Sequence, residues 1–296
     1  MEEIKYPIIE EHRRDIVCEY SHSPAPNHLG KGGKEKDIAG LKPREKRNCL
    51  IEELDGYNSK FNIGFEIEKF RISRRNIQHN ALIKGYEKDV SIRDNNGRSG
   101  KGVEAITHIL PLLPKSLWRM KVYDLFVRAK HLIEEEYSQS NESCGGHITL
   151  SCVGMGGDEL VKKMRKHSAV LLAIYRQRLQ NTYCNRNLRM LNNPTYRGYK
   201  YSLCRVKDKT IEFRIPTRFT SVKQMMRRYE LFYILMDVAV NRPNTSHDSL
   251  MEQIRPTLNL MYDGDLQKVL LIETLSTYFR KYIMRGEQDG GIGNYL

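Results

Sequence analysis

Apolar and polar residues alternate along several short segments of the chain. The clearest segments are 61–72, 146–153 and 210–216. Successive side chains of a β-strand point to opposite faces, so this alternation predicts half-buried strands with one apolar and one polar face. Further strands are expected at 86–92, 102–108 and 199–206. The last of these would form a hairpin with 210–216 by turning at Lys207-Asp208-Lys209.

Other segments place apolar residues at helical spacing. This spacing predicts a helix over 116–137 and one long helix over 157–179. Ser221 is a favourable N-cap residue and is expected to begin a third helix. Two more helices, at roughly 247–256 and 264–285, follow Pro243.

The order of these elements predicts an α+β fold, in which an antiparallel sheet carries helices on its apolar face. The chain divides into three expected parts. Residues 1–58 form a polar lead-in, partly extended; residues 59–242 form the main domain of strands and helices; residues 243–296 form a helical extension.

Bulk properties narrow the class of protein. The 49 basic and 36 acidic residues give a net charge of +13, which favours polyanionic partners such as nucleotides, nucleic acid or an acidic polymer. The six cysteines are scattered, as is typical of a reduced cytosolic protein. No apolar run is long enough to span a bilayer, and the first five residues do not resemble a signal peptide, so a cytoplasmic protein without a membrane partner is expected.

The polar faces of the predicted strands carry acids, a histidine and an arginine. Glu66 and Glu68 share one face of their strand, roughly 7 Å apart. Clustered carboxylates repel one another unless positive charge lies between them. A divalent metal site is therefore predicted. The residues expected to hold the metal are Glu66, Glu68, Glu104, His147 and Glu212, and Arg214 lies on the same polar face as Glu212.

Each of these residues also has an ordinary structural interpretation. A single strand acid is usually solvated, and a lone histidine after glycines usually bonds to backbone. The metal hypothesis gains weight because four strands repeat the pattern. Two glycine-rich basic loops, 30–34 and 97–102, lack the spacing of a P-loop, and the early cysteines and histidines match no familiar zinc module.

The motifs Gly-Phe-Glu-Ile-Glu (64–68), Gly-Val-Glu-Ala-Ile-Thr (102–107), Cys-Gly-Gly-His (144–147) and Thr-Ile-Glu-Phe-Arg (210–214) occur in an order that resembles the amidoligase family. These are carboxylate–amine ligases of the glutamine synthetase and glutamate–cysteine ligase superfamily. The resemblance covers roughly residues 57–240. It implies a curved antiparallel sheet that forms a half-barrel, with helices on its convex face and ATP and divalent metals on its concave face.

The resemblance also implies roles for the metal ligands. Glu66, His147 and Glu212 match positions that hold one metal near the nucleotide phosphates. Glu68 and Glu104 match positions that hold a second metal near the acyl substrate and the γ-phosphate. The implied cofactors are ATP and Mg²⁺, with Mn²⁺ as a substitute, since oxygen ligands suit these hard ions.

Other residues are expected to act on the phosphates. Arg214 resembles the arginine that neutralises the transferring phosphoryl group, and Glu104 and Glu212 are its expected catalytic companions. Ser91, within an Asp-x-Ser element, and Arg178 are expected to bind the nucleotide along with Arg214.

The activity implied by these roles is an ATP-dependent carboxylate–amine ligase. It forms an amide through an acyl phosphate and releases ADP and phosphate. Its partners would be a carboxylate and an amine, either small molecules or groups on a peptide or protein. Two alternatives stay open: a metal-dependent nuclease or phosphoryl hydrolase, and a non-catalytic basic protein that binds nucleic acid.

Overall fold

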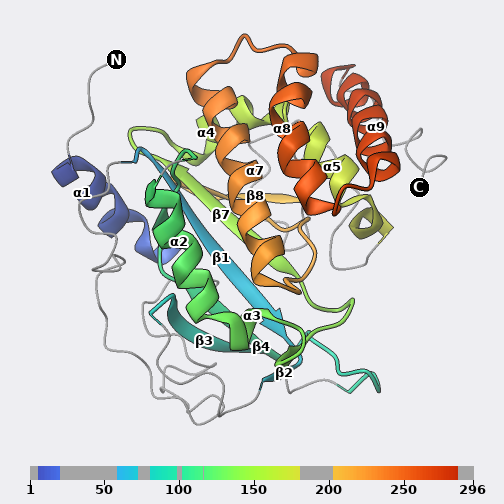
Figure 1. The fold of residues 1–296 in the computed structure, drawn as a ribbon. Coiled ribbons are helices and arrows are strands. Elements are labelled where there is room, and N and C mark those ends of the chain that lie inside the picture. The colour runs from blue at the N-terminus through green and yellow to red at the C-terminus, as the bar shows by residue number, and fades with distance from the viewer. Residues whose placement is uncertain are drawn as a thin grey trace.

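The fold is described from a computed structural model (Figure 1). The structure describes residues 6–20, 59–72, 81–98, 102–115, 117–180 and 203–285. A mixed α/β arrangement places helices α2 (Leu117–Arg128), α4 (Gly157–Arg165) and α7 (Val222–Asn241) across one face of a sheet. No helix in these ranges is long and apolar enough to cross a membrane.

The main sheet has the strand order β3-β4-β1-β7-β9-β8, with β5 added beside β1. Every strand pairing within the described residues is antiparallel. Because β3 and β8 are its outer strands, the sheet is open. The strands are β1 (Phe61–Lys69), β3 (Ile83–Asp89), β4 (Gly102–Thr107), β5 (Leu110–Pro111), β7 (Gly146–Cys152), β8 (Cys204–Val206) and β9 (Thr210–Phe213).

The helices after the first strands follow the predicted order. They are α2 (Leu117–Arg128), α3 (Lys130–Ile133), α4 (Gly157–Arg165), α5 (Ala169–Ile174), the 3-10 helix η4 (Arg176–Gln180), α7 (Val222–Asn241), α8 (His247–Met261) and α9 (Leu266–Arg285). The predicted cap of α7 is confirmed, since the Ser221 side chain accepts the N–H of Gln224 at 3.1 Å. The antiparallel strand pairings, together with these helices, confirm the predicted α+β architecture.

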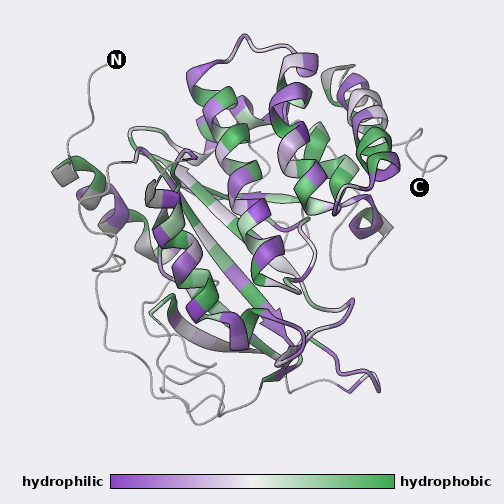
Figure 2. Cartoon of the chain, viewed as in Figure 1, coloured by the Kyte–Doolittle hydropathy of each residue, from purple (hydrophilic) through white to green (hydrophobic). Residues whose placement is uncertain are grey.

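One face of the sheet forms the core with the helices. Phe65 of β1 packs edge-on against Phe126 of α2 and against Phe219, with ring centroids 5.7 Å apart in both pairs. Phe213 of β9 lies against Phe232 of α7. Figure 2 shows β1 alternating between hydrophobic and hydrophilic residues along its length. The other face of the sheet therefore carries the polar residues.

The structure differs from several of the predicted elements. The predicted helix over 116–137 divides at Ala129 into α2 and α3 and ends at Ile133, and the strand predicted at 86–92 lies at Ile83–Asp89. The predicted helix over 157–179 is interrupted by a turn at 166–168, and the buried residues 169–173 that follow pack against α9. The predicted strand over 61–72 ends at Lys69. There the chain leaves the main sheet, and β2 (Arg71–Ile72) pairs instead with β6 (Ser138–Gln139).

Part of the lead-in, which was predicted to be partly extended, is helical. Residues 6–20 are not extended: Tyr6–Ile16 form α1, and Val17–Tyr20 form the 3-10 helix η1. Ile9 and Ile16 of α1 are buried, which gives this helix an apolar face to pack. The remainder of the lead-in, and the start of the predicted strand at 199–206, lie outside the described residues.

Replacing Tyr229 with phenylalanine tests the hydrogen bonds that link α7 to the backbone at 111–113, where β5 ends. The Tyr229 hydroxyl accepts the N–H of Leu113 at 2.7 Å and donates to the carbonyl of Pro111 at 2.8 Å, fully buried. Removing it leaves two buried backbone groups without this partner, so the free energy of unfolding should fall by about 1–3 kcal/mol. Urea denaturation measures this loss. A half-buried tyrosine on the same helix, Tyr233→Phe, is the matched control and should change stability far less.

Candidate metal centre

The strand register brings the predicted acids together on the polar face of the sheet. Glu66 lies opposite His147 across β1 and β7, and Glu68 lies opposite Glu104 across β1 and β4. Glu212 of β9 lies opposite Thr149, two residues along β7 from His147. The four glutamates and His147 are at most 5% exposed. Residues far apart in sequence thus form one buried polar cluster.

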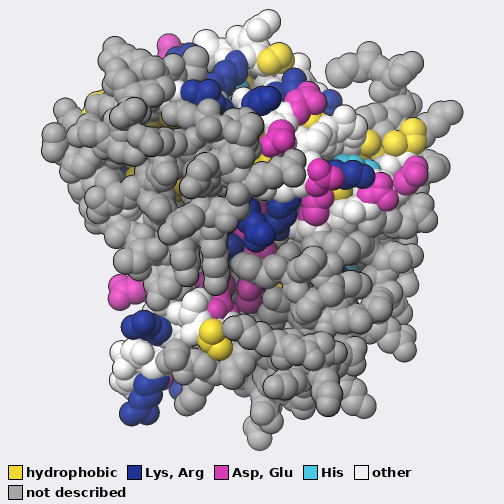
Figure 3. All heavy atoms as spheres, turned by 180° about the vertical axis from the view of Figure 1, so that it is seen from behind, with side chains coloured by type: hydrophobic (Ala, Val, Ile, Leu, Met, Phe, Trp, Pro, Cys, Tyr) yellow, Lys and Arg dark blue, Asp and Glu magenta, His cyan; other side chains and the backbone are white. Residues whose placement is uncertain are grey.

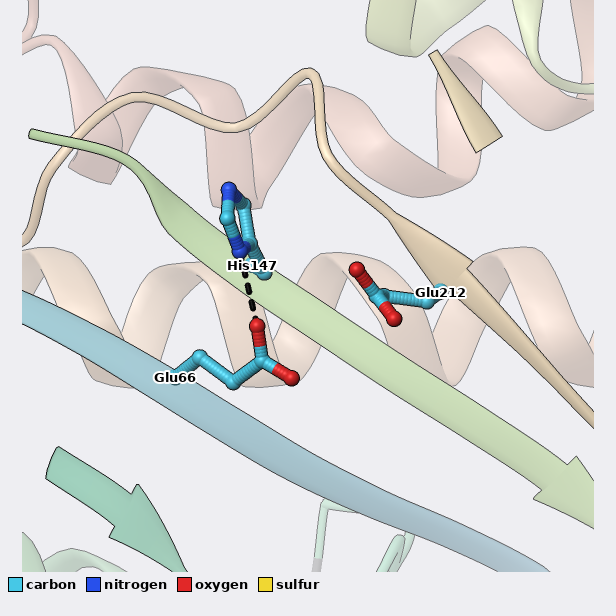
Figure 4. Close-up of side chains that lie close together, drawn as sticks. All are labelled: Glu66, His147 and Glu212. Carbon is cyan, nitrogen blue, oxygen red and sulfur yellow. Dashed lines mark hydrogen bonds and ion pairs between the residues drawn. The ribbon is translucent and has the colours of Figure 1, made fainter. Parts of the chain in front are cut away.

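His147 is the centre of this cluster. Its Nδ1 lies 2.7 Å from Oε2 of Glu66, and its Nε2 lies 3.4 Å from Oε1 of Glu68. Figure 4 shows the imidazole beside Glu66, with the Glu212 carboxylate reaching towards them from β9. The other oxygen of Glu68 accepts the N–H of Gly145 at 2.5 Å. The glycines before His147 therefore keep the backbone close enough to orient Glu68.

The cluster divides into two groups of candidate metal ligands. Glu66, His147 and Glu212 form one, and Glu68, Glu104 and His147 form the other. Within each group, one ligand atom from each residue lies within 4.8 Å of the others. Carboxylate oxygens with one imidazole suit Mg²⁺ or Mn²⁺. The residues fit divalent ions, because four buried carboxylates this close repel one another without positive charge between them.

Glu212 is also held by two cationic side chains. Its Oε1 lies 2.5 Å from the guanidinium of Arg214, and its Oε2 lies 2.8 Å from Nζ of Lys207. Burial and the charge of Glu66 oppose ionisation of Glu212. Lys207 and Arg214 outweigh them and lower the pKa of Glu212 to about 2. The carboxylate is therefore charged at neutral pH and available as a ligand.

Arg214 stays charged in the same environment. Burial alone would lower the pKa of its guanidinium, but Glu212 and Glu66 raise it above its usual value. The side chain is 7% exposed and lies at the edge of the first ligand group. A permanent cation beside two carboxylates is suited to a further anion, such as a phosphoryl group.

Lys207 is a site residue that the sequence prediction missed. It was assigned only to the hairpin turn, yet it pairs with Glu212. The strand register explains this pairing. Arg205 lies opposite Glu212, and Lys207 follows Arg205 by two residues and so points to the same face of the sheet. Alternation across the turn would have placed a lysine beside the predicted metal ligand.

The two other predicted nucleotide-binding residues lie away from the ligand groups. Both the N–H and the hydroxyl of Ser91 donate to Oδ1 of Asp89, at 2.7 and 2.6 Å, and so form a local turn at the end of β3. Arg178 lies in η4 and lines a pocket that also includes Cys144. Burial raises the pKa of the Cys144 thiol to about 11, so this cysteine is not an activated nucleophile.

The polar strip of β1 and β7 continues beyond the metal ligands and is covered there by the N-terminal segment. Tyr20 donates to the hydroxyl of Ser151 at 3.0 Å, and Arg13 donates to Asn62 at 2.6 Å. A Cβ atom on Gly64 would lie 2.4 Å from the Tyr20 ring. Glycine at this position lets η1 approach the strip closely.

This covering should loosen in acid. His12 lies 3.2 Å from the Ser151 hydroxyl, and burial together with Lys209 lowers its pKa from 6.5 to about 4. A histidine with a lowered pKa favours the packed state above pH 6.5, and this contribution is lost as the pH falls towards 4. Amide-exchange protection factors of residues 6–20 should therefore drop across this range, and His12→Gln should flatten the change. Equal pH dependence in both proteins would contradict the expectation.

Comparison with known proteins adds little to this geometry. No protein-family model matches the chain, and no curated protein matches it. One solved structure with a weak likeness to the chain is the apo, ligand-free form of GmaS, with a TM-score of 0.31 and 10% sequence identity. The overlap covers 81% of this chain and 73% of that chain. A likeness this weak carries no argument about family or activity, so the chemistry rests on the site itself.

Proposed function

We propose that the chain is an ATP-dependent carboxylate–amine ligase. The observation that carries the proposal is the pair of ligand groups that share His147 on neighbouring antiparallel strands. Their residues belong to motifs whose order resembles that of the amidoligases. Such a ligase has to bind a polyphosphate beside a carboxylate, and two adjacent divalent ions suit that task.

The described residues fit these ions as follows. Glu66, His147 and Glu212 would hold one, and Glu68 and Glu104, with His147 beside them, would hold the other. Bound there, Mg²⁺ would offset negative charge on the phosphate oxygens. The ions would also explain how four glutamates are accommodated together at such low exposure.

Arg214 would act on the reacting groups directly, and Lys207 would act through Glu212. Arg214 adjoins Glu212 and would attract the phosphoryl group as it passes from ATP to the substrate carboxylate. Lys207 fixes the other oxygen of Glu212 and so orients that ligand. Attack of an amine on the acyl phosphate would then form the amide and break the bond to phosphate.

The proposal is tested by incubating the full chain with ATP, Mg²⁺ and panels of acids and amines, following ADP and amide product by mass spectrometry. Product and ADP should appear together, and removing Mg²⁺ with a chelator should stop both. Cleavage of nucleic acid without ATP would instead favour the hydrolase alternative. Nucleic-acid binding that weakens steeply with salt, without any turnover, would favour the non-catalytic alternative.

A further inference from the structure

A pocket of about 1100 Å³ lies next to the Cys144-Gly145 segment, which contacts Glu68 of the second ligand group. Its walls include the loop at 93–97, the loop at 140–144, η4 and residues 217–218. Cys144 lines it and is followed directly by Gly145, whose N–H binds Glu68. The pocket therefore opens beside the end of β1 that carries Glu68, whereas Tyr20 covers the other end.

Arg178 gives this pocket a buried cation. The residue is 5% exposed, and its Nε has no hydrogen-bond partner among the described residues. One terminal nitrogen donates to the carbonyl of Glu142, at a long 3.4 Å. A buried guanidinium with such incomplete bonding is costly unless an anion completes it.

A second buried arginine lies directly behind the pocket wall. Arg228 is 2% exposed and donates to the backbone and hydroxyl of Thr217, which lines the pocket. Burial and the charge of Arg178 both lower the pKa of Arg228, and only Tyr175 and Tyr262 oppose them among its described influences. Arg228 is held by Thr217 and by the rings of Tyr175 and Phe219, and it adds buried positive charge behind the wall, which favours an anion in the pocket.

Two further arginines widen the positive surface. Arg93 is exposed on one wall, and Arg218 lies on another, 3.3 Å from Glu135. Of the two acids that line the pocket, Asp94 accepts the N–H groups of Asn96 and Arg98, at 2.9 Å each, and so serves its own loop. Glu142 is exposed. Figure 3 shows Lys and Arg side chains beside Asp and Glu side chains near the middle of the face behind the sheet.

The pocket is preformed by its own hydrogen bonds. The Asn141 amide donates to the carbonyl of Arg93 at 2.9 Å and to the side chain of Asn95 at 3.2 Å, which ties the two loops together. Its oxygen accepts the N–H of Ser143 at 3.0 Å. A wall held in this way loses little entropy when a ligand binds.

We infer that this pocket binds an acidic peptide, so that the acid substrate is a carboxylate within a chain of neighbouring carboxylates. This inference rests on the proposed ligase function, and it assigns Arg178 to the acid substrate where the sequence alone suggested a nucleotide contact. The volume of about 1100 Å³ lies at the upper end of typical small-molecule sites, so the pocket has room for a short peptide. The planar guanidinium of an arginine can bind a carboxylate through two parallel N–H···O hydrogen bonds, so the arginines of the pocket suit a ligand that carries carboxylates.

The test is fluorescence anisotropy with a labelled triglutamate peptide and the full chain, without ATP or added metal. Triglutamate should bind at least about tenfold more tightly than labelled trialanine, and free glutamate should compete at least about tenfold more weakly than unlabelled triglutamate. Arg178→Gln and Arg93→Gln should each weaken triglutamate binding by about tenfold or more. Arg176→Gln, two residues along η4 and outside the pocket lining, is the matched control and should bind normally.

Several results would overturn the inference. Equal affinity for triglutamate and trialanine would do so, as would free glutamate competing as well as the peptide, or an equal loss in Arg176→Gln. Arg93 is exposed, so its variant decides the matter even if Arg178→Gln fails to fold. Ligase turnover on acidic peptides with a KM unchanged in both variants would refute the pocket and leave the ligase intact. Peptide binding that depends on these arginines, without any turnover, would support the pocket and count against the ligase function.

Discussion

If the proposed ligase function holds, replacing Glu212 with glutamine is expected to lower turnover by at least about 100-fold, because it removes a charged member of the first candidate ligand group and the partner of Arg214. It should also lower the free energy of unfolding by about 3–5 kcal/mol, since Arg214 and Lys207 would keep their charges without this carboxylate. Turnover and urea denaturation measure the two losses separately.

The stability loss should depend on pH in a defined direction. The pKa of Glu212 is lowered from 4.5 to about 2, so its carboxylate stabilises the folded chain above pH 4.5, and this contribution declines as the pH falls towards 2. The difference in unfolding free energy between wild type and Glu212→Gln should therefore shrink below pH 4.5. Glu159→Gln, an exposed acid of α4, is the matched control. A Glu212→Gln protein as active as this control would contradict the assigned role.

Replacing His147 with alanine should lower turnover by at least about 1,000-fold, a loss of about 4 kcal/mol in transition-state stabilisation. His147 belongs to both ligand groups, so one substitution damages both metal positions. It also leaves Glu66 and Glu68 without the imidazole between them. Steady-state turnover at saturating ATP and Mg²⁺ measures the effect.

The control for His147→Ala is His131→Ala. This residue lies in helix α3, and its ring packs against the ring of Tyr137. The same side-chain deletion there should leave turnover within about a factor of two, since His131 is half-buried and lies outside both ligand groups. Retained activity in His147→Ala, with a fold as stable as that of the control, would remove the histidine from the mechanism.

Strand alternation was sufficient to predict the polar face of the sheet. In β1 the apolar positions 61, 63, 65 and 67 pack towards the helices, and Glu66 and Glu68 consequently face the opposite side. Cross-strand neighbours did not follow from alternation alone, because register depends on where each strand begins. The motif resemblance supplied the grouping of Glu66 with His147 and Glu212.

Other features needed three-dimensional contacts. The cover formed by Tyr20 over Gly64 joins two polar segments with no shared pattern, and nothing local in the lead-in shows what it packs against. Lys69 occupies an apolar-facing position of β1, where the carbonyls of Ile133 and Phe219 each accept from its Nζ at 2.8 Å. Such pairings depend on distant backbone atoms, which residue types do not reveal.

The most direct test of the central claim is a count of bound Mn²⁺ by electron paramagnetic resonance on the chain without nucleotide. Two ions per chain are expected, one for each ligand group, and Glu104→Gln should weaken one of them selectively. His147→Ala should weaken both. A chain that binds no Mn²⁺ at these groups, or binds it equally well in both variants, would contradict the claim that carboxylates from separate strands gather here to hold divalent ions.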